Sequence, residues 1–238
     1  MTDRPAQDAR IDALPARIAA ARNRIARAAQ AASRDPGDVR LLLATKTLPD
    51  VVVRAAVLAG ATLLGENRVQ ELTAHAPAVA DLAPTIHLIG HLQSNKVAAA
   101  LRRVSCVQSV DSADLAARLS RRCAADGREL EVMVQVNVSG EPSKSGVAPA
   151  AAADLAAAVA ALPHLRLTGF MTIGARSPDA ALVRAGYARL REVRDDVVRG
   201  GLTGATELSM GMSGDLELAV AEGATIVRLG TAVFGARA

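Results

Sequence analysis

One segment, VRLLLATKTLPDVVVRAAVLA at residues 39–59, contains the repeating unit of the fold. Its first part, Val39–Thr45, is a short, largely apolar run, which is typical of a strand buried on both faces of a parallel sheet. Its second part, Pro49–Ala59, has apolar positions at helical spacing and predicts a helix. Lys46 and Thr47, between the two parts, therefore lie where the strand ends and the helix has not yet begun.

The same alternation continues along the rest of the chain. Seven further apolar runs predict strands, and most of them precede a segment with helical spacing. We expect these strands at Thr62–Leu64, Thr85–Ile89, Val104–Gln108, Leu130–Val138, Leu165–Phe170, Thr206–Met210 and Ile226–Leu229. We expect helices at 67–79, from Ser94, from Ser112, at 148–161, at 179–199 and near 214–222, and an additional amphipathic helix ahead of the first strand at 11–33.

Eight β-then-α units in 238 residues point to one fold class. They predict an α/β protein built as a single (β/α)8 TIM-type barrel with an extra N-terminal helix, in one domain that spans residues 1–238. A doubly wound open sheet is the alternative arrangement of the same units. Hydrophobic residues make up 50% of the chain but aromatic residues only 1%, so small aliphatic side chains must fill the layers between helices and strands.

The composition also excludes several function classes. The net charge of +4 comes with arginines scattered over the predicted helices, and the chain has no Trp and no basic run with interleaved aromatic residues. Nucleic-acid binding, which uses such surfaces, is therefore not expected. Cys106 and Cys123 are expected to be small core residues rather than a disulfide or a metal site. We find no signal peptide and no membrane-spanning stretch, and so expect a cytoplasmic protein without a membrane partner.

Lysine is rare in this sequence, which makes each lysine a candidate for chemistry. Of the 28 basic residues only three are Lys, namely Lys46, Lys96 and Lys144. An amine can lose its proton and attack a carbonyl group, whereas a guanidinium cannot. Lys46 follows the first strand, and the carboxyl ends of the strands form the active-site mouth of a (β/α)8 barrel. By its position alone, Lys46 is either a Schiff-base lysine or an ordinary solvated lysine.

Two glycine-containing segments follow the seventh and eighth strands. They read LSMGMSGD at residues 208–215 and RLGT at residues 228–231. Backbone N–H groups at the start of a helix bind phosphate, and phosphate sites after strands seven and eight are common in such barrels. The two segments therefore predict a phosphate site, with ordinary tight turns as the alternative.

Three polar segments allow more than one interpretation. Asn67, in GENRVQE at residues 65–71, is either the N-cap of the next helix or part of a pocket. His87 and His91 form a pair that could suggest a metal, but no third ligand follows at a fitting spacing, so no metal is expected. The segment NVSGEPSKSG at residues 137–146 is either a lid or a surface turn.

Together these segments resemble one known family. They are the strand that ends at Lys46, GENRVQE at 65–71, the segment from His87 to Lys96, NVSGEPSKSG at 137–146, GFMTI at 169–173, and residues 208–235. In this order they resemble the pyridoxal phosphate homeostasis protein family, the single-domain relatives of the alanine racemase N-terminal barrel. Two positions depart from the family pattern, with Phe170 in place of Leu and Gly174 in place of Pro.

The resemblance implies a cofactor, pyridoxal 5′-phosphate (PLP), and a set of residues around it. The implied cofactor-binding residues are Lys46, Asn67, His87, Met171, Ser213, Arg228, Gly230 and Thr231. Among them, Lys46 would carry the Schiff base, Arg228 would face the pyridine nitrogen, and Ser213, Gly230 and Thr231 would hold the phosphate group. A guanidinium keeps the ring nitrogen unprotonated, so the ring is a weaker electron sink than one paired with a carboxylate.

The resemblance further implies a role in intracellular PLP (vitamin B6) homeostasis rather than substrate turnover. The alternative is a PLP-dependent amino-acid racemase, which needs a base on each face of the substrate. In full-length racemases, as the resemblance implies, the second base is a Tyr from a β-rich domain of the partner subunit, and this chain shows no such domain. Its only tyrosine, Tyr187, is expected on the barrel exterior. We therefore expect a monomeric PLP carrier, not an enzyme, with PLP-dependent apo-enzymes as candidate partners.

Overall fold

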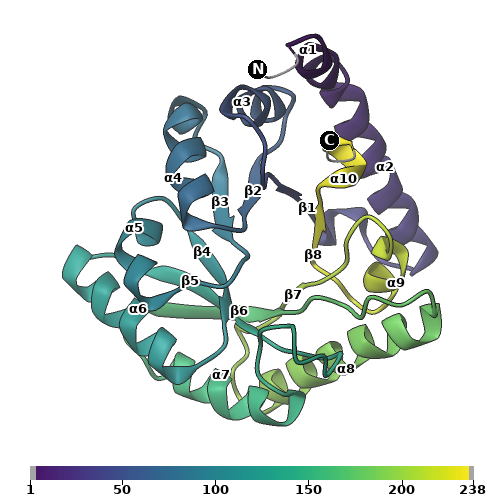
Figure 1. The fold of residues 1–238 in the computed structure, drawn as a ribbon. Helices are drawn as coiled ribbons and strands as arrows, with labels where there is room; N and C mark the ends of the chain where they lie inside the picture. The colour runs from purple at the N-terminus through teal and green to yellow at the C-terminus, as the bar shows by residue number, and fades with distance from the viewer. Residues whose placement is uncertain (1–3, 236–238) are drawn as a thin grey trace.

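The computed structural model describes residues 4–235 and shows a closed barrel of eight parallel strands surrounded by helices (Figure 1). The strands follow one another around the barrel in chain order, from β1 to β8. The barrel closes because β1 pairs with β2 on one side and with β8 on the other, so that Leu43 lies opposite both Leu64 and Leu229. The predicted (β/α)8 barrel is therefore confirmed, and the open-sheet alternative is wrong.

All eight predicted strands are present, with shifted ends. Their bounds are β1 (Arg40–Ala44), β2 (Leu63–Glu66), β3 (Thr85–Leu88), β4 (Cys106–Val110), β5 (Leu130–Gln135), β6 (Leu165–Met171), β7 (Glu207–Ser209) and β8 (Ile226–Leu229). β2 continues past the predicted apolar run because Gly65 and Glu66 pair with His87 and Leu88 of β3. A buried glutamate ends this strand, and an apolar pattern cannot reveal such a residue.

The helices follow the predicted order, but several are shorter than expected. Their bounds are α1 (Arg4–Asp12), α2 (Leu14–Ala31), α3 (Asp50–Leu58), α4 (Val69–Ala78), α5 (Val97–Leu101), α6 (Ala113–Asp126), α7 (Ala152–Ala160), α8 (Ala180–Arg199), α9 (Leu216–Ala221) and α10 (Thr231–Phe234). The helix predicted at 11–33 is interrupted at Ala13, so that its main part is α2. Figure 1 shows α2 on the outside of the barrel beside α9 and α10, against which it packs.

The apolar side chains form two layers. Inside the barrel lies a small cluster that consists of Leu42, Leu63, Ile89, Cys106, Met133, Met171 and Ile226. A larger cluster between the strands and the helices contains mostly Ala, Val and Leu, as the low aromatic content predicts. Cys106 and Cys123 are both buried free thiols, which confirms that they are core residues. Among residues 4–235, no helix has the length and apolar character that a bilayer crossing requires.

Candidate functional site at the mouth of the barrel

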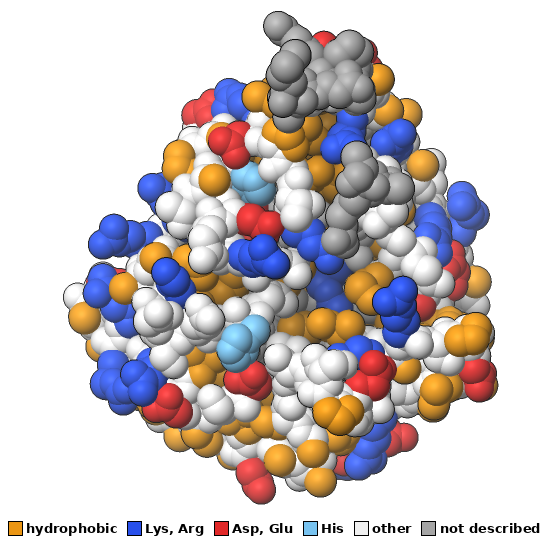
Figure 2. Space-filling model, in the orientation of Figure 1, with side chains coloured by type: hydrophobic (Ala, Val, Ile, Leu, Met, Phe, Trp, Pro, Cys, Tyr) orange, Lys and Arg blue, Asp and Glu red, His pale blue; other side chains and the backbone are white. Residues whose placement is uncertain are grey.

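A cavity of about 790 Å³ opens at the carboxyl ends of the strands. Six of the eight residues that the sequence singled out line it, namely Lys46, Asn67, Ser213, Arg228, Gly230 and Thr231. They come from the ends of β1, β2 and β8 and from the segment between β7 and α9. Figure 2 shows this face as hollowed near its centre, with basic side chains around the hollow. The volume lies within the range of ligand pockets.

Lys46 stands just beyond β1, in a loop with an unusual backbone conformation. The next residue, Thr47, has φ 62°, a left-handed value that β-branched residues rarely adopt. Two hydrogen bonds fix it there: the Thr47 N–H donates to Glu71 Oε1 over 3.0 Å, and its hydroxyl donates to the Lys46 carbonyl over 2.7 Å. The structure thus turns the chain sharply at the point where Lys46 enters the cavity.

A buried ion pair supports this loop from behind. His75 on α4 places Nδ1 2.8 Å from Glu66 Oε1 and Nε2 2.9 Å from the carbonyl oxygen of Leu48. Both neighbours are acceptors, so only a doubly protonated imidazole satisfies both contacts. Burial is the largest single effect and opposes that charge. The hydrogen bond to Glu66, the charges of Glu66 and Asp50 and the Leu48 carbonyl together outweigh burial and raise the pKa of His75 above its ordinary value. The sequence patterns do not reveal this contact between Glu66 and His75.

The segment between β7 and α9 is held by a different kind of contact. Asp215 accepts a hydrogen bond from the Met212 N–H over 2.6 Å and one from the Tyr187 hydroxyl over 2.8 Å. Ser213 Oγ accepts a hydrogen bond from the Ala232 N–H over 3.3 Å, which ties the segment to α10. Ser213, in the first of the two segments that the sequence assigned to a phosphate site, therefore contacts the residue that directly follows the second.

The expected place of Tyr187 on the barrel exterior is wrong. Its side chain is fully buried, because the face of α8 that carries Tyr187, Val183 and Leu190 packs inward. Burial and the neighbouring Asp215 carboxylate raise the pKa of the phenol. Gly174 makes room for the ring, since a Cβ at that position would lie 2.5 Å from the Tyr187 hydroxyl oxygen. Gly174, where the family pattern has Pro, thus leaves the space that the buried Tyr187 ring occupies in this chain.

Arg228 lies on β8 at the floor of the cavity and is almost completely buried. Its guanidinium donates to Ser209 Oγ over 2.9 Å and to the Thr172 carbonyl over 2.7 Å. Both acceptors are neutral, and burial lowers the pKa of Arg228. A buried cation with neutral partners is costly unless a bound group compensates it. The floor of the cavity therefore favours a ligand that presents a lone pair or a negative charge.

Asn67 also belongs to the cavity. α4 begins at Val69 and is capped by Arg68, so the interpretation of Asn67 as an N-cap is wrong. Its Oδ1 is buried and accepts no hydrogen bond from the residues that the structure describes. Gly90 allows the loop to approach, because a Cβ there would lie only 2.0 Å from the Asn67 carbonyl oxygen. Asn67 thus offers an unused acceptor at the cavity.

The two remaining residues, Met171 and His87, lie deeper than expected. Neither belongs to the residues that line the cavity. Met171 is part of the apolar cluster inside the barrel. His87 is also buried, and its Nδ1 lies 2.7 Å from the amide nitrogen of Gln108.

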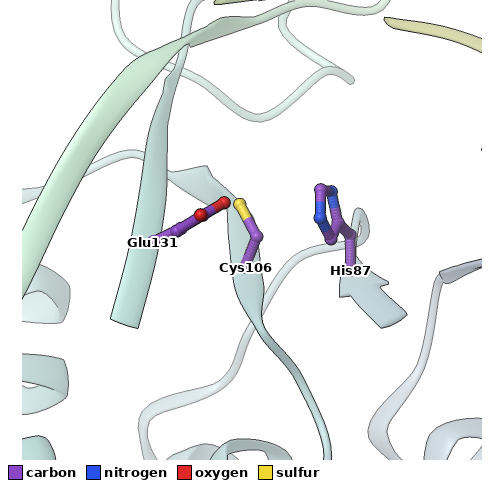
Figure 3. A group of neighbouring side chains, drawn as sticks. All are labelled: His87, Cys106 and Glu131. Atoms are coloured by element: carbon purple, nitrogen blue, oxygen red, sulfur yellow. The ribbon is translucent and has the colours of Figure 1, made fainter. Parts of the chain in front are cut away.

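The histidine that the sequence paired with His87 is elsewhere, since His91 lies 3.6 Å from an Asp111 carboxylate oxygen. His87 instead faces Cys106 and Glu131 (Figure 3), and one potential ligand atom of each lies within 4.8 Å of the others. Burial raises the pKa of the Cys106 thiol well above its ordinary value. Glu131 is paired with Arg166. The cluster combines ligand types that zinc accepts, but His87 already contacts Gln108 and Glu131 is already paired with Arg166.

The fold and the site define a class of protein, and comparison with known proteins supports it. Residues 17–238 match the family model of the alanine racemase N-terminal domain, so the chain belongs to that family. The structure superimposes with a TM-score of 0.90 on that of an unknown protein from Bifidobacterium adolescentis, which is 44% identical, with 95% of this chain and 96% of that chain covered.

Two further relatives narrow the class. The chain is 48% identical over 220 residues to the pyridoxal phosphate homeostasis protein of Pseudomonas aeruginosa, with 92% of this chain and 94% of the relative covered. It is 37% identical to PipY of Synechococcus elongatus, whose structure with PLP bound superimposes with a TM-score of 0.78, covering 89% of this chain and 100% of that chain. The chain therefore belongs to the pyridoxal phosphate homeostasis protein family.

Proposed function

We propose that this chain binds PLP covalently through a Schiff base on Lys46 and serves intracellular PLP homeostasis without a substrate of its own. The observation that carries the proposal is the meeting of Lys46, buried Arg228 and the Ser213 segment in one cavity. These residues satisfy the three chemical ends of PLP, namely an aldehyde, a ring nitrogen and a phosphate group.

The residues of the cavity fit this group on structural grounds. Arg228 is a buried cation without an anionic partner among its hydrogen bonds, and a ring nitrogen supplies the lone pair that it lacks. Asn67 supplies a buried acceptor that is not otherwise used. Ser213, Gly230 and Thr231 lie together around the start of α10, where N–H groups favour phosphate. His87 and Met171 lie below the cavity and act, in this proposal, as support for it.

Each of the three groups around the cavity has its own task in this proposal. PLP, when bound, supplies an aldehyde that condenses with an amine and a ring that withdraws electrons. Lys46 provides the amine, Arg228 keeps a proton away from the ring nitrogen, and the Ser213 segment fixes the phosphate group. The guanidinium contact weakens the electron-withdrawing power of the ring, which suits a protein that holds the cofactor.

The cavity also disfavours the racemase alternative. Among the described residues that line it, Lys46 is the only Lys, and none is Asp, Glu, His, Cys or Tyr. Racemisation requires a second base on the opposite face. Tyr187 does not supply one, because its buried hydroxyl donates to Asp215. We therefore propose a carrier that acts in the cytoplasm as a monomer and exchanges PLP with apo-enzymes.

The test is spectroscopic. The purified protein is incubated with PLP, its visible absorbance is recorded before and after borohydride reduction, and the labelled peptide is mapped. We expect a reducible adduct on Lys46 that is lost in Lys46→Ala and retained in the matched variants Lys96→Ala and Lys144→Ala. An adduct that persists in Lys46→Ala would overturn the proposal. Incubation with L- and D-alanine tests the alternative, because sustained racemisation at enzyme-like rates would contradict the carrier role.

A further inference from the structure

A chain of buried hydrogen bonds crosses the interior of the barrel below the cavity. Arg228 Nη1 lies 2.9 Å from Ser209 Oγ, Ser209 Oγ lies 2.6 Å from Gln108 Oε1, and Gln108 Nε2 lies 2.7 Å from His87 Nδ1. The four residues stand on β8, β7, β4 and β3, and all are buried. β4 and β7 are not neighbours in the barrel, so the contact between Gln108 and Ser209 spans its interior.

The direction of every bond in this chain follows from its first member and from the orientation of the Gln108 amide. A guanidinium can only donate, so Ser209 Oγ must accept from Arg228. The Gln108 amide presents Oε1 to Ser209 and Nε2 to His87, so the Ser209 hydroxyl hydrogen donates to Gln108 Oε1. The amide nitrogen donates, so His87 Nδ1 must accept and carries no proton. The neutral ring therefore holds its proton on Nε2.

The surroundings of His87 agree with this tautomer. Burial, with a further contribution from the charge of Arg40, lowers the pKa of His87 to about 4. The ring is thus neutral near physiological pH and can accept at Nδ1. The same logic argues against a metal between His87, Cys106 and Glu131 (Figure 3), because Nδ1 is occupied and a protonated Nε2 is not a ligand.

We propose that Ser209, Gln108 and His87 are positioning residues that hold the Arg228 guanidinium toward the ring nitrogen of PLP. The inference rests on the proposed function and assigns a task to His87, which does not reach the cavity. Without an acceptor at Gln108, the Ser209 hydroxyl loses the partner that keeps its lone pairs turned to Arg228. Without His87, the buried amide nitrogen of Gln108 loses its acceptor, and burial makes such a loss costly.

The first test needs no variant. The chain has four histidines, so their ring nitrogens can be resolved by long-range ¹H–¹⁵N correlation in the full-length protein. We expect His87 to be neutral with its proton on Nε2. A proton on Nδ1 would reverse the direction of the chain and overturn the proposal, and it would do so whether or not PLP binds.

The second test removes the relay. Gln108→Leu should raise the Kd for PLP roughly 3–10-fold, the range of one buried hydrogen bond, and shift the absorbance maximum of bound PLP. Gln108→Glu keeps an acceptor for Ser209 and should restore both readouts toward the wild type. The matched control is Thr168→Val, which removes a buried hydroxyl that donates to the Val132 carbonyl over 3.3 Å and lies outside the relay.

The outcomes separate this inference from the proposed function. A wild-type protein without a reducible adduct on Lys46 would contradict the function, whereas normal wild-type binding with an unchanged spectrum and Kd in Gln108→Leu would overturn only the relay. An equal shift in Thr168→Val would also overturn it, because general packing would then explain the effect. If Gln108→Leu does not fold, Ser209→Ala gives the same readouts with a smaller change in volume.

Discussion

The two sides of the cavity are held by different electrostatics. On the side of Lys46, a buried imidazolium bridges the Glu66 carboxylate and the Leu48 carbonyl. On the side of the segment between β7 and α9, which carries Ser213, the neutral Tyr187 hydroxyl donates to Asp215. The first arrangement depends on a proton that is lost as the pH rises through the raised pKa of His75, and the second does not. We therefore expect mutation and pH to change the stability of the loop that carries Lys46 more strongly than that of the segment that carries Ser213.

The largest effect is expected where the buried ion pair is broken. Glu66→Leu removes an acceptor of both His75 and the Thr45 hydroxyl and leaves the buried His75 charge with only the exposed Asp50 carboxylate, 3.7 Å away. We expect a loss of about 3–5 kcal/mol in the free energy of unfolding, measured by urea titration at pH 6. The control is Glu131→Gln, which weakens a partly exposed pair with Arg166 and should cost no more than about 1 kcal/mol. Equal losses in both variants would remove the contrast between the buried pair and an ordinary one.

A smaller loss of stability is expected on the side of the cavity that carries Ser213. Tyr187→Phe keeps the buried ring and removes only the donor to Asp215. We expect a loss of about 1–3 kcal/mol in the free energy of unfolding, because Asp215 Oδ2 loses its donor while Oδ1 keeps the Met212 N–H. The loss should be the same at pH 6 and pH 8, because burial keeps the phenol protonated throughout. The control is Thr73→Val, whose hydroxyl donates within α4. A loss that shrinks as the pH rises would make the two sides alike.

The pH dependence of stability sharpens the comparison directly. The folded-state pKa of His75 is raised above its ordinary value near 6.5. Its contribution is therefore complete below about pH 6.5 and is lost as the pH rises through the raised pKa. His87 acts in the opposite direction and in a separate pH window. Because its folded-state pKa is lowered to about 4, the protein loses stability as the pH falls from 6.5 to about 4.

We expect unfolding curves between pH 6.5 and pH 9 to show this decline in the wild type and not in His75→Gln. The matched variant His91→Gln changes an exposed histidine and should retain the decline. A wild-type stability that is flat over this range would mean that His75 is neutral in the folded protein.

The smallest change in stability is expected at Ser213. Its hydroxyl is part-exposed and accepts one long hydrogen bond from Ala232, so Ser213→Ala should change the free energy of unfolding by no more than about 0.5 kcal/mol. The Kd for PLP should nevertheless rise about tenfold, because a hydrogen bond to a charged phosphate is lost. Ser105→Ala, which removes a hydroxyl that donates to the Ile86 carbonyl just ahead of β4, should leave the Kd unchanged. Equal Kd values for Ser213→Ala and the wild type would exclude Ser213 from the phosphate site.

The sequence predicted the barrel because each unit of the fold is local. A continuous apolar run followed by helical spacing is visible within about 20 residues, and eight such units leave few alternatives. The cavity was predictable for the same reason, since Lys46 and the segment that contains Ser213 both follow strands whose ends must meet at one mouth. Short-range patterns in the sequence therefore predicted both the barrel and the cavity at the ends of its strands.

The contacts that position these residues are not local, and no pattern announced them. Gln108 and Ser209 are 101 residues apart and meet only because the barrel is closed. His75 reaches Glu66 because α4 folds back over β2. The burial of Tyr187 could have been predicted from the sequence. Val183 and Leu190 lie on the same face of the helix, and that apolar spacing indicates the side that packs inward.

The closure of the barrel by β1 and β8 also has a consequence for biosynthesis. β1 is among the first strands to leave the ribosome, but its partner β8 follows Lys46 by about 180 residues, which corresponds to roughly 10–40 s of translation. During that interval β1 has one unpaired edge, and the growing sheet ends in another, which exposes backbone groups to neighbouring chains. The lysine loop can form early, whereas the floor of the cavity is completed only with Arg228. Ribosome-bound chains would therefore be expected to gain PLP affinity in a single late step.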